Sequence, residues 1–240
     1  MTEFNKSQWA KPKFTQEYRD SADVYVVDRR RLLDILKSFY KHFIGNKTKI
    51  NVLDLGCGDG IVIQELLKID NSIAATLIDG SEDMLNKAKD RLKDSENIRF
   101  IKASFQEILN KKISLQRYDF IVSSLAIHHL TMKEKKALFR TIYSHLNVRG
   151  YFLNIDVILA PSDALEQWYL SLWREWISER KTTMGIEDNS YDDIIQRYKD
   201  NRDNKPDTLD KQLKALKSIG FKDVDCYYKY GIFTMYGGRK

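Results

Sequence analysis

Residues 51–60 read Asn-Val-Leu-Asp-Leu-Gly-Cys-Gly-Asp-Gly, an apolar run that ends in alternating glycines just before the apolar, helix-favouring stretch 61–68. Glycine has no Cβ, so glycines at 56, 58 and 60 permit a sharp turn and a close approach of the backbone to a ligand. A helix that follows directly would present unpaired N–H groups and the positive end of its dipole to that ligand. The stretch therefore predicts a strand–turn–helix unit that binds a nucleotide cofactor.

The spacing of the glycines distinguishes between cofactors. In the dinucleotide fingerprint G-x-G-x-x-G, the third glycine allows close helix–strand packing and the helix start holds a pyrophosphate. Here the third glycine comes one residue early, and Ile61 fills the expected place. A second apolar run, 74–78, ends at Asp79, and an acid at this position can accept hydrogen bonds from both ribose hydroxyls. A ribose acceptor beside a turn without a good pyrophosphate site favours S-adenosylmethionine (SAM) over NAD.

These segments resemble a known family. The stretch 52–60, the segment Leu77-Ile78-Asp79 and the segment 118–124 (Tyr-Asp-Phe-Ile-Val-Ser-Ser) resemble class I SAM-dependent methyltransferases, and the resemblance extends from about Trp9 to the C-terminus. It implies that SAM is the cofactor and that a methyl group passes to an O, N or S atom of a small-molecule acceptor. The resemblance also implies a set of cofactor-binding residues: Asp54, Gly56, Cys57 and Gly58 in and before the turn, Asp79 at the ribose, Gly80 and Met84 at the adenine, and Ser124 beneath the sulfur.

One position departs from the family pattern. After the third strand the family often has an acid that accepts a hydrogen bond from the adenine amino group, whereas this chain reads Ala103-Ser104-Phe105. The hydroxyl of Ser104 can still accept a hydrogen bond, but without the assistance of a charge. Ser104 and Phe105 are the expected contacts at this end of the cofactor.

The remaining pattern predicts an α/β fold. Apolar runs at 98–102, 120–125 and 151–157 alternate with helical stretches at 81–92, 131–146 and 208–219, which argues for a parallel sheet with helices on both faces. Two final runs, 224–228 and 232–236, flank Gly231 as a hairpin. We expect one domain over residues 1–240, a doubly wound, mostly parallel seven-stranded sheet with a C-terminal antiparallel hairpin. The hairpin is typical of the methyltransferase sheet and not of the dehydrogenase sheet.

Two segments outside the sheet are expected to form the substrate side. The N-terminal segment 1–45 carries Trp9, Phe14 and Tyr18 before a helix that starts near Asp28, and it predicts a helical lid over the cofactor. The insertion 159–206 predicts a helical cap, with a broad aromatic face, a loop over 182–189 and a second short helix over 191–201. Most of that face is expected to pack in the core. The candidate substrate-binding residues are Tyr18, Trp173 and Trp176.

Arg29 shares a helix face with Leu32, Leu33 and Leu36, at the spacing of a buried stripe. A buried arginine needs an anionic partner, because an unpaired charge away from water is very costly. The carboxylate of the cofactor, an acidic substrate and a nearby aspartate of the chain are all candidate partners. We include Arg29 among the candidate cofactor-binding residues.

Two adjacent histidines, His128 and His129, follow the fourth strand at the edge where ligands bind in open α/β sheets. Methyl transfer needs a base only if the acceptor must lose a proton, and these histidines are the candidates for that catalytic role. A pocket-shaping role is the alternative. The histidines and cysteines show no spacing typical of a zinc or iron site, so no metal is expected.

Composition and charge indicate where the protein works and which partners it has. The chain has 240 residues, two cysteines and no apolar run long enough to cross a membrane, which predicts a cytoplasmic protein without a disulfide framework. Of the net charge of +6, residues 1–50 contribute +5 (eleven basic against six acidic residues), while residues 160–206 carry −3 (seven against ten). The basic segment leaves nucleic acid as a possible but not favoured partner. The alternatives to a small-molecule methyltransferase are a tRNA-modifying transferase, which would transfer a methyl or carboxymethyl group, and a non-catalytic SAM-binding protein.

Overall fold

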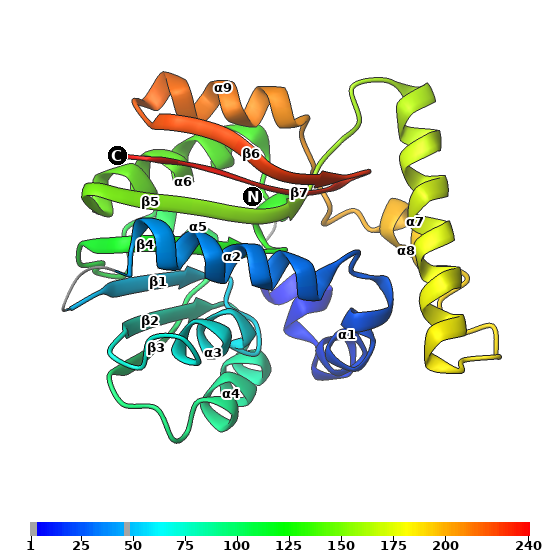
Figure 1. Cartoon of the computed structure of the whole chain (residues 1–240), viewed down its shortest axis with the longest axis horizontal. Helices are drawn as coiled ribbons and strands as arrows, with labels where there is room; N and C mark the ends of the chain where they lie inside the picture. Colours follow the sequence, from blue (N-terminus) through cyan, green and yellow to red (C-terminus); the bar gives the residue numbers. More distant parts are fainter. Residues whose placement is uncertain (1–3, 46–48) are drawn as a thin grey trace.

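The strand that precedes the glycine turn, β1 (Asn51–Leu55), lies between β2 (Ala74–Asp79) and β4 (Tyr118–Ser124) and runs parallel to both (Figure 1). The computed structural model describes residues 4–45 and 49–240. The other strands are β3 (Ile98–Lys102), β5 (Leu146–Val157), β6 (Lys222–Tyr230) and β7 (Phe233–Arg239). The seven strands follow the order β3-β2-β1-β4-β5-β7-β6, in which only the β5–β7 and β7–β6 pairs are antiparallel. The predicted doubly wound sheet with its closing hairpin is confirmed.

Helices cover both faces of the sheet because successive residues of a buried strand point to opposite sides. Val52 belongs to one core cluster, with residues of α2 (Arg29–Phe43), α3 (Ile61–Leu67) and α4 (Glu82–Arg91). Leu53 belongs to the cluster of the other face, with residues of α5 (Phe105–Leu109), α6 (Met132–His145) and α9 (Leu209–Ile219). The turn after β1 lies at the carboxyl edge of the sheet, because it follows the end of a strand that runs parallel to both neighbours.

A third core cluster lies at that same edge. It joins α1 (Pro12–Tyr25), α7 (Asp163–Met184) and α8 (Ile194–Asp200) to the end of β5 at Val157 and the start of β7 at Phe233. Figure 1 shows α7 standing beside the sheet, with α1 next to it. Three short 3-10 helices complete the described elements. η1 (Phe4–Lys6) and η2 (Gln8–Ala10) precede α1 in the chain, and η3 (Ile127–His129) follows β4. The N-terminal helix α1 and the helices α7 and α8 of the segment 159–206 therefore meet at the edge where ligands bind in such folds.

Three predicted boundaries were wrong. Strand β5 begins at Leu146 and not at residue 151, because the predicted turn is an irregularity inside the strand, between the Tyr118–Leu146 and Phe120–Tyr151 pairs. Helix α7 continues through residues 182–184, and Gly185, with φ of 66°, ends it in the left-handed conformation. The second cap helix, α8, is shorter than predicted. In the described part of the chain, no helix combines the length and the apolar character that a membrane span requires.

Candidate active site

The backbone after β1 makes a tight turn that faces open space. Gly56, Gly58 and Gly60 have φ values of 68°, 53° and 78°. The N–H groups of Gly56 and Cys57 both donate to the carbonyl of Ile78, at 2.8 and 3.0 Å, and so hold the turn against the end of β2. A Cβ added at Gly58 would meet no atom within 4 Å. The turn therefore leaves its backbone accessible to a ligand, as the glycine spacing predicted.

Carboxylates gather around this turn. Asp79 accepts hydrogen bonds from Gly58 N at 2.9 Å and from Ser81 N at 2.8 Å, and burial raises its pKa although these backbone bonds partly offset the rise. Asp54 is buried, and neither of its carboxylate oxygens has a hydrogen-bond partner among the described residues. Burial, together with the nearby charges of Asp79 and Asp59, raises the pKa of Asp54 well above its usual value. A cationic ligand relieves this concentration of negative charge, and a pyrophosphate would add to it.

A first cavity of about 160 Å³ opens at the glycine turn. Its walls come from the turn, the ends of β2 and β4 and the start of α5, and its cover comes from Phe4, Ser7 and Trp9 in the N-terminal segment. The Phe4 ring lies so close to Gly80 that a Cβ at this glycine would sit 2.7 Å from a ring carbon. The N-terminal segment therefore lies against the first cavity.

A second, larger cavity of about 420 Å³ adjoins the first. Trp9, Tyr18, Val26, Leu125 and His129 line both cavities and form the wall between them. The second cavity is rich in aromatic side chains from the lid, the cap and β7: Trp9, Phe14, Tyr18, Tyr25, Trp173, Tyr198 and Phe233.

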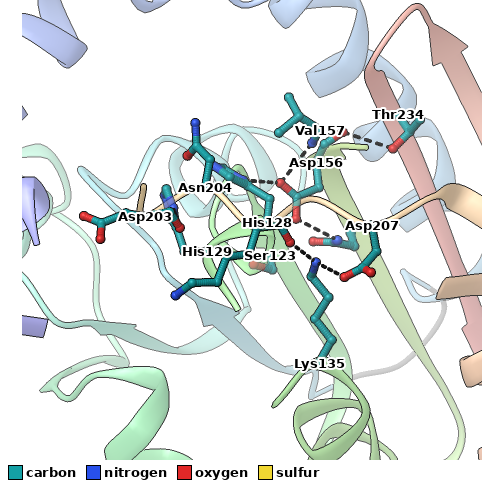
Figure 2. Close-up of polar contacts among 12 residues, drawn as sticks. Ser123, His128, His129, Lys135, Asp156, Val157, Asp203, Asn204, Asp207 and Thr234 are labelled. Carbon is teal, nitrogen blue, oxygen red and sulfur yellow. Dashed lines mark hydrogen bonds and ion pairs between the residues drawn. The ribbon is translucent and has the colours of Figure 1, made fainter. Parts of the chain in front are cut away.

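His128 lines the second cavity and is held by a carboxylate (Figure 2). Its Nδ1 lies 2.6 Å from Oδ1 of Asp156, and both side chains are buried. Asp156 also accepts hydrogen bonds from the backbone N–H of Val157 at 3.0 Å and from Nδ2 of Asn154 at 3.2 Å. Because the carboxylate accepts the Nδ1 proton, Nε2 of His128 remains the nitrogen that can take a proton from a ligand.

His129 differs from its neighbour. Its Nδ1 lies 3.2 Å from the backbone carbonyl of Asp203, which can only accept, so this nitrogen carries the proton. Its Nε2 is buried and has no hydrogen-bond partner among the described residues. Burial, and then the proximity of His128, lowers the pKa of His129 well below its usual value, so the ring is neutral. Nε2 therefore offers a free acceptor at the wall between the cavities.

Comparison with known proteins names the family of this site. Residues 52–150, which include the turn, match the family model described as a methyltransferase domain. This part of the chain matches a methyltransferase domain, and it contains the turn that carries the resemblance to class I SAM-dependent methyltransferases. SAM is the cofactor of this enzyme family, and its sulfonium and ammonium charges fit the acidic surroundings of the turn.

Two relatives of the methyltransferase differ in activity. It is 27% identical over 206 residues to carboxy-S-adenosyl-L-methionine synthase from Helicobacter pylori, a match that covers 83% of this chain and 82% of that protein. It is 31% identical over 128 residues to malonyl-[acyl-carrier protein] O-methyltransferase 1 from Ilyobacter polytropus, covering 53% of this chain and 44% of that protein.

Solved structures share the fold. A putative SAM-dependent methyltransferase from Methanococcus maripaludis superposes with a TM-score of 0.65 at 17% identity, over 100% of this chain and 97% of that one. An O-methyltransferase family protein from Burkholderia thailandensis gives a TM-score of 0.68 at 11% identity, over 98% of this chain. The methyltransferase spans about three fifths of that longer chain (62%).

The first cavity brings together nearly all the predicted cofactor-binding residues. Asp54 is the exception, since it lines neither cavity. The hydroxyl of Ser104 accepts from Glu107 N at 3.3 Å and donates to the Glu107 carboxylate at 2.9 Å, so it caps α5. The predicted residues that line the first cavity are Arg29, Gly56, Cys57, Gly58, Asp79, Gly80, Met84, Ser104, Phe105 and Ser124.

The predicted substrate residues are divided. Tyr18 and Trp173 line the second cavity, whereas Trp176 lines neither cavity. The indole of Trp176 donates to the carbonyl of Val24 at 3.2 Å and belongs to the contact between α7 and α1. Trp176 therefore lies apart from the other two predicted substrate residues. Arg29 pairs with a carboxylate of the chain, that of Asp23, at 2.5 Å.

The sequence reasoning missed Asp156, although a signal was present. Asp156 is an acid inside the apolar strand β5, and a buried acid requires a partner that neutralises or hydrogen-bonds it. Tyr198 and Phe233 were also missed as cavity residues, because nothing in their local sequence distinguishes them from core aromatics. In the described ranges, no cluster of three or more His, Cys, Asp and Glu side chains is arranged to hold a metal ion.

Proposed function

We propose that the methyltransferase binds SAM in the first cavity and transfers its methyl group to an O, N or S atom of a small molecule in the second cavity. The observation that carries this proposal is the shared wall of Trp9, Tyr18, Val26, Leu125 and His129. The two cavities adjoin there, so a donor in one and an acceptor in the other can approach in line while the lid excludes water.

Three of the predicted cofactor residues, and His128, have a specific role in this proposal. Asp79, at the end of β2, accepts hydrogen bonds from the ribose hydroxyls. The open backbone at Gly58 lies along the methionine part of SAM, and Arg29 offers its carboxylate a cation that it shares with Asp23. His128 takes the proton of an acceptor that must lose one, while Asp156 stabilises the imidazolium that forms. We further propose that residues 1–240 form one domain with a lid over 1–45 and a cap over 159–206.

Formation of carboxy-SAM is a second candidate function, since the similarity to the Helicobacter pylori synthase covers most of the chain. Such a reaction needs a source of the carboxyl group, and a carboxylate co-substrate would need a cationic partner. Within residues 4–45 and 49–240, the only Lys or Arg that lines the second cavity is Arg197, which is exposed and pairs with Asp193 at 3.0 Å. Methyl transfer is therefore the function we favour.

Calorimetric titration with SAM, S-adenosylhomocysteine (SAH) and NAD tests the cofactor. We expect both adenosyl ligands to bind and NAD not to bind. Asp79→Ala should weaken SAM binding by roughly tenfold or more, through the loss of charge-assisted hydrogen bonds. Asp90→Asn, an exposed change on α4, is the control. NAD binding, or an Asp79→Ala variant with unchanged SAM affinity, would contradict the proposal.

Mass spectrometry of the adenosyl product separates the two candidate functions. Methyl transfer converts SAM to SAH, which is lighter by one methyl group. Formation of carboxy-SAM gives a product that is heavier than SAM by one carboxyl unit.

A further inference from the structure

We infer that the acceptor is a neutral aromatic compound with a hydroxyl group on its ring, and that His128 removes the proton of this hydroxyl during transfer. The inference rests on the proposed function, because it assigns the occupant of the second cavity. Three features of that cavity carry it: its aromatic walls, the position of its charges and the two histidines among its lining residues.

The walls favour a flat ring. Trp173 lies edge-on to Tyr198 and to Phe233, with ring centroids 5.4 and 5.3 Å apart and interplanar angles of 83° and 79°. Trp173 and Phe233 are buried, and the indole N–H of Trp173 is already bonded to the carbonyl of Tyr25 at 2.7 Å. These surfaces therefore offer ring faces and edges, which attract another aromatic ring. The volume of about 420 Å³ is in the range of small-ligand pockets.

The charges favour a neutral ligand. The charged residues that line the second cavity, apart from its histidines, are Glu17, Arg197 and Asp200, and all three are exposed. The carboxylate of Asp200 also accepts hydrogen bonds from the Gln196 side chain at 2.9 Å. A carboxylate, phosphate or ammonium group carried into the buried part would lose its hydration without gaining a counter-charge.

The histidines favour a hydroxyl. A phenol has a pKa of about 10, as the tyrosine side chain does, so at neutral pH its oxygen is mostly protonated and weakly nucleophilic. Nε2 of His128 is available because Asp156 holds Nδ1 at 2.6 Å. The unpartnered Nε2 of His129 supplies a second acceptor at the wall toward the first cavity.

Methyl transfer to the ring hydroxyl is a displacement at the methyl carbon of SAM. An oxygen lone pair of the acceptor forms a bond to the methyl carbon as the carbon–sulfur bond breaks, and the electrons of that bond remain on sulfur as neutral SAH. The hydroxyl proton passes to Nε2 of His128, and the Asp156 carboxylate balances the imidazolium. His128 then releases the proton to water when the product leaves.

The test is a matched panel of acceptors with the full chain and SAM. It comprises a phenol, the corresponding aniline and the corresponding benzoate, with SAH formation and methylated product measured for each. We expect kcat/KM for ring hydroxyls to exceed that of the amine and the carboxylate by at least about tenfold. Preference for the amine or for the carboxylate overturns the inference, and so does failure of every ring hydroxyl.

Calorimetry with SAM on the same preparation keeps the two proposals apart. If SAM binds and ring hydroxyls fail, the acceptor class is wrong and the proposed function stands. If SAM does not bind, the proposed function fails first.

Variants test the role of His128 with a series of phenols of decreasing pKa. His128→Asn should lower kcat about 100-fold for an ordinary phenol. For electron-poor phenols, which are already ionised at the assay pH, the kcat of the variant should approach that of the wild type. Asp156→Asn should show the same trend with a smaller loss, and His42→Asn, on the exposed part of α2, should show none. SAM binding confirms that each variant is folded. A loss that is the same for all phenols would mean that His128 shapes the pocket and does not remove a proton.

Discussion

Asp54 is a buried carboxylate next to the glycine turn, and we expect its ionisation to depend on whether a cation is bound there. Its carboxylate has no hydrogen-bond partner among the described residues, and burial and two neighbouring acids raise its pKa. A group whose pKa is raised on folding contributes stability below its ordinary pKa, and this contribution is lost as the pH rises through the folded value. The ligand-free enzyme should therefore lose stability as Asp54 ionises, while the positive charges of SAM oppose that loss.

Asp54→Asn should separate these effects. The substitution removes the ionisable group. Between the ordinary pKa of an aspartate and the raised pKa of Asp54, the ligand-free wild type should therefore lose stability relative to the variant. The difference between their free energies of unfolding should grow by about 1.4 kcal/mol per pH unit over that range. SAM affinity should fall, because the negative charge that attracts the cation is lost. Urea denaturation from mildly acidic to mildly alkaline pH, with SAM titrations in parallel, measures both. Parallel stability curves for the two proteins would show that Asp54 does not titrate in this range.

At this scale the residues of the first cavity were largely predictable, and those of the second only in part. Gly56, Gly58 and Asp79 lie in two contiguous motifs whose chemistry is local, so their spacing indicates a ligand before any tertiary contact is known. The second cavity is assembled from side chains of the lid, η3, β7 and the cap, which only packing brings together. Asp156 illustrates why the second cavity is harder to predict. The sequence shows an acid inside an apolar strand, but its partner, His128, is 28 positions away, so the pair cannot be identified from local sequence.

The contact between α1 and α7 shows how helices define the cavity boundary. Trp173 and Trp176 both donate an indole hydrogen bond to a carbonyl at the end of α1, where the last carbonyls of a helix have no partner of their own. Only Trp173 also lines the second cavity. Helical spacing predicts that the two side chains share a face of α7, and the neighbouring helix decides which of them reaches the ligand.

The two tryptophans form a matched pair for mutation. Trp176→Phe and Trp173→Phe should each lower the free energy of unfolding by about 1 kcal/mol, the usual net contribution of one hydrogen bond. Only Trp173→Phe should raise the KM of the acceptor, because only its ring borders the second cavity. Denaturation curves and steady-state kinetics measure the two effects. An equal rise of KM in both variants would contradict this division.

On the scale of the whole molecule, the lid joins parts that are far apart in the sequence. The Asp83 carboxylate of α4 accepts hydrogen bonds from Thr15 Oγ1 at 2.5 Å and from Arg19 Nη1 at 2.7 Å, both in α1. The hydrogen bond from Thr15 is the main reason why the pKa of Asp83 is lowered. On the other side, Ser7 donates to Asp203 of the segment after α8 at 2.9 Å. The lid thus spans from the cofactor side of the sheet to the cap.

Asp83→Asn should loosen this closure. The amide still accepts a hydrogen bond but loses the ion pair with Arg19, so we expect the dissociation rate of SAH to rise roughly five- to tenfold. The fold should be unaffected, since the contact is on the lid and not in the sheet. Stopped-flow displacement of SAH measures the rate, with Asp90→Asn on the exposed side of the same helix as the control. An unchanged rate would mean that the lid is held by its aromatic contacts alone.

The wall that Trp9 and Tyr18 provide to both cavities has a consequence for the order of events in a catalytic cycle. Both residues belong to the N-terminal segment, so the acceptor cavity is complete only when this segment is in place, and we expect the segment to move when SAM enters. Binding should therefore be sequential, with SAM first and SAH last. SAH should compete with SAM and not with the acceptor. A high concentration of acceptor should also slow turnover, because acceptor that occupies the second cavity before SAH departs keeps the lid shut over the spent cofactor.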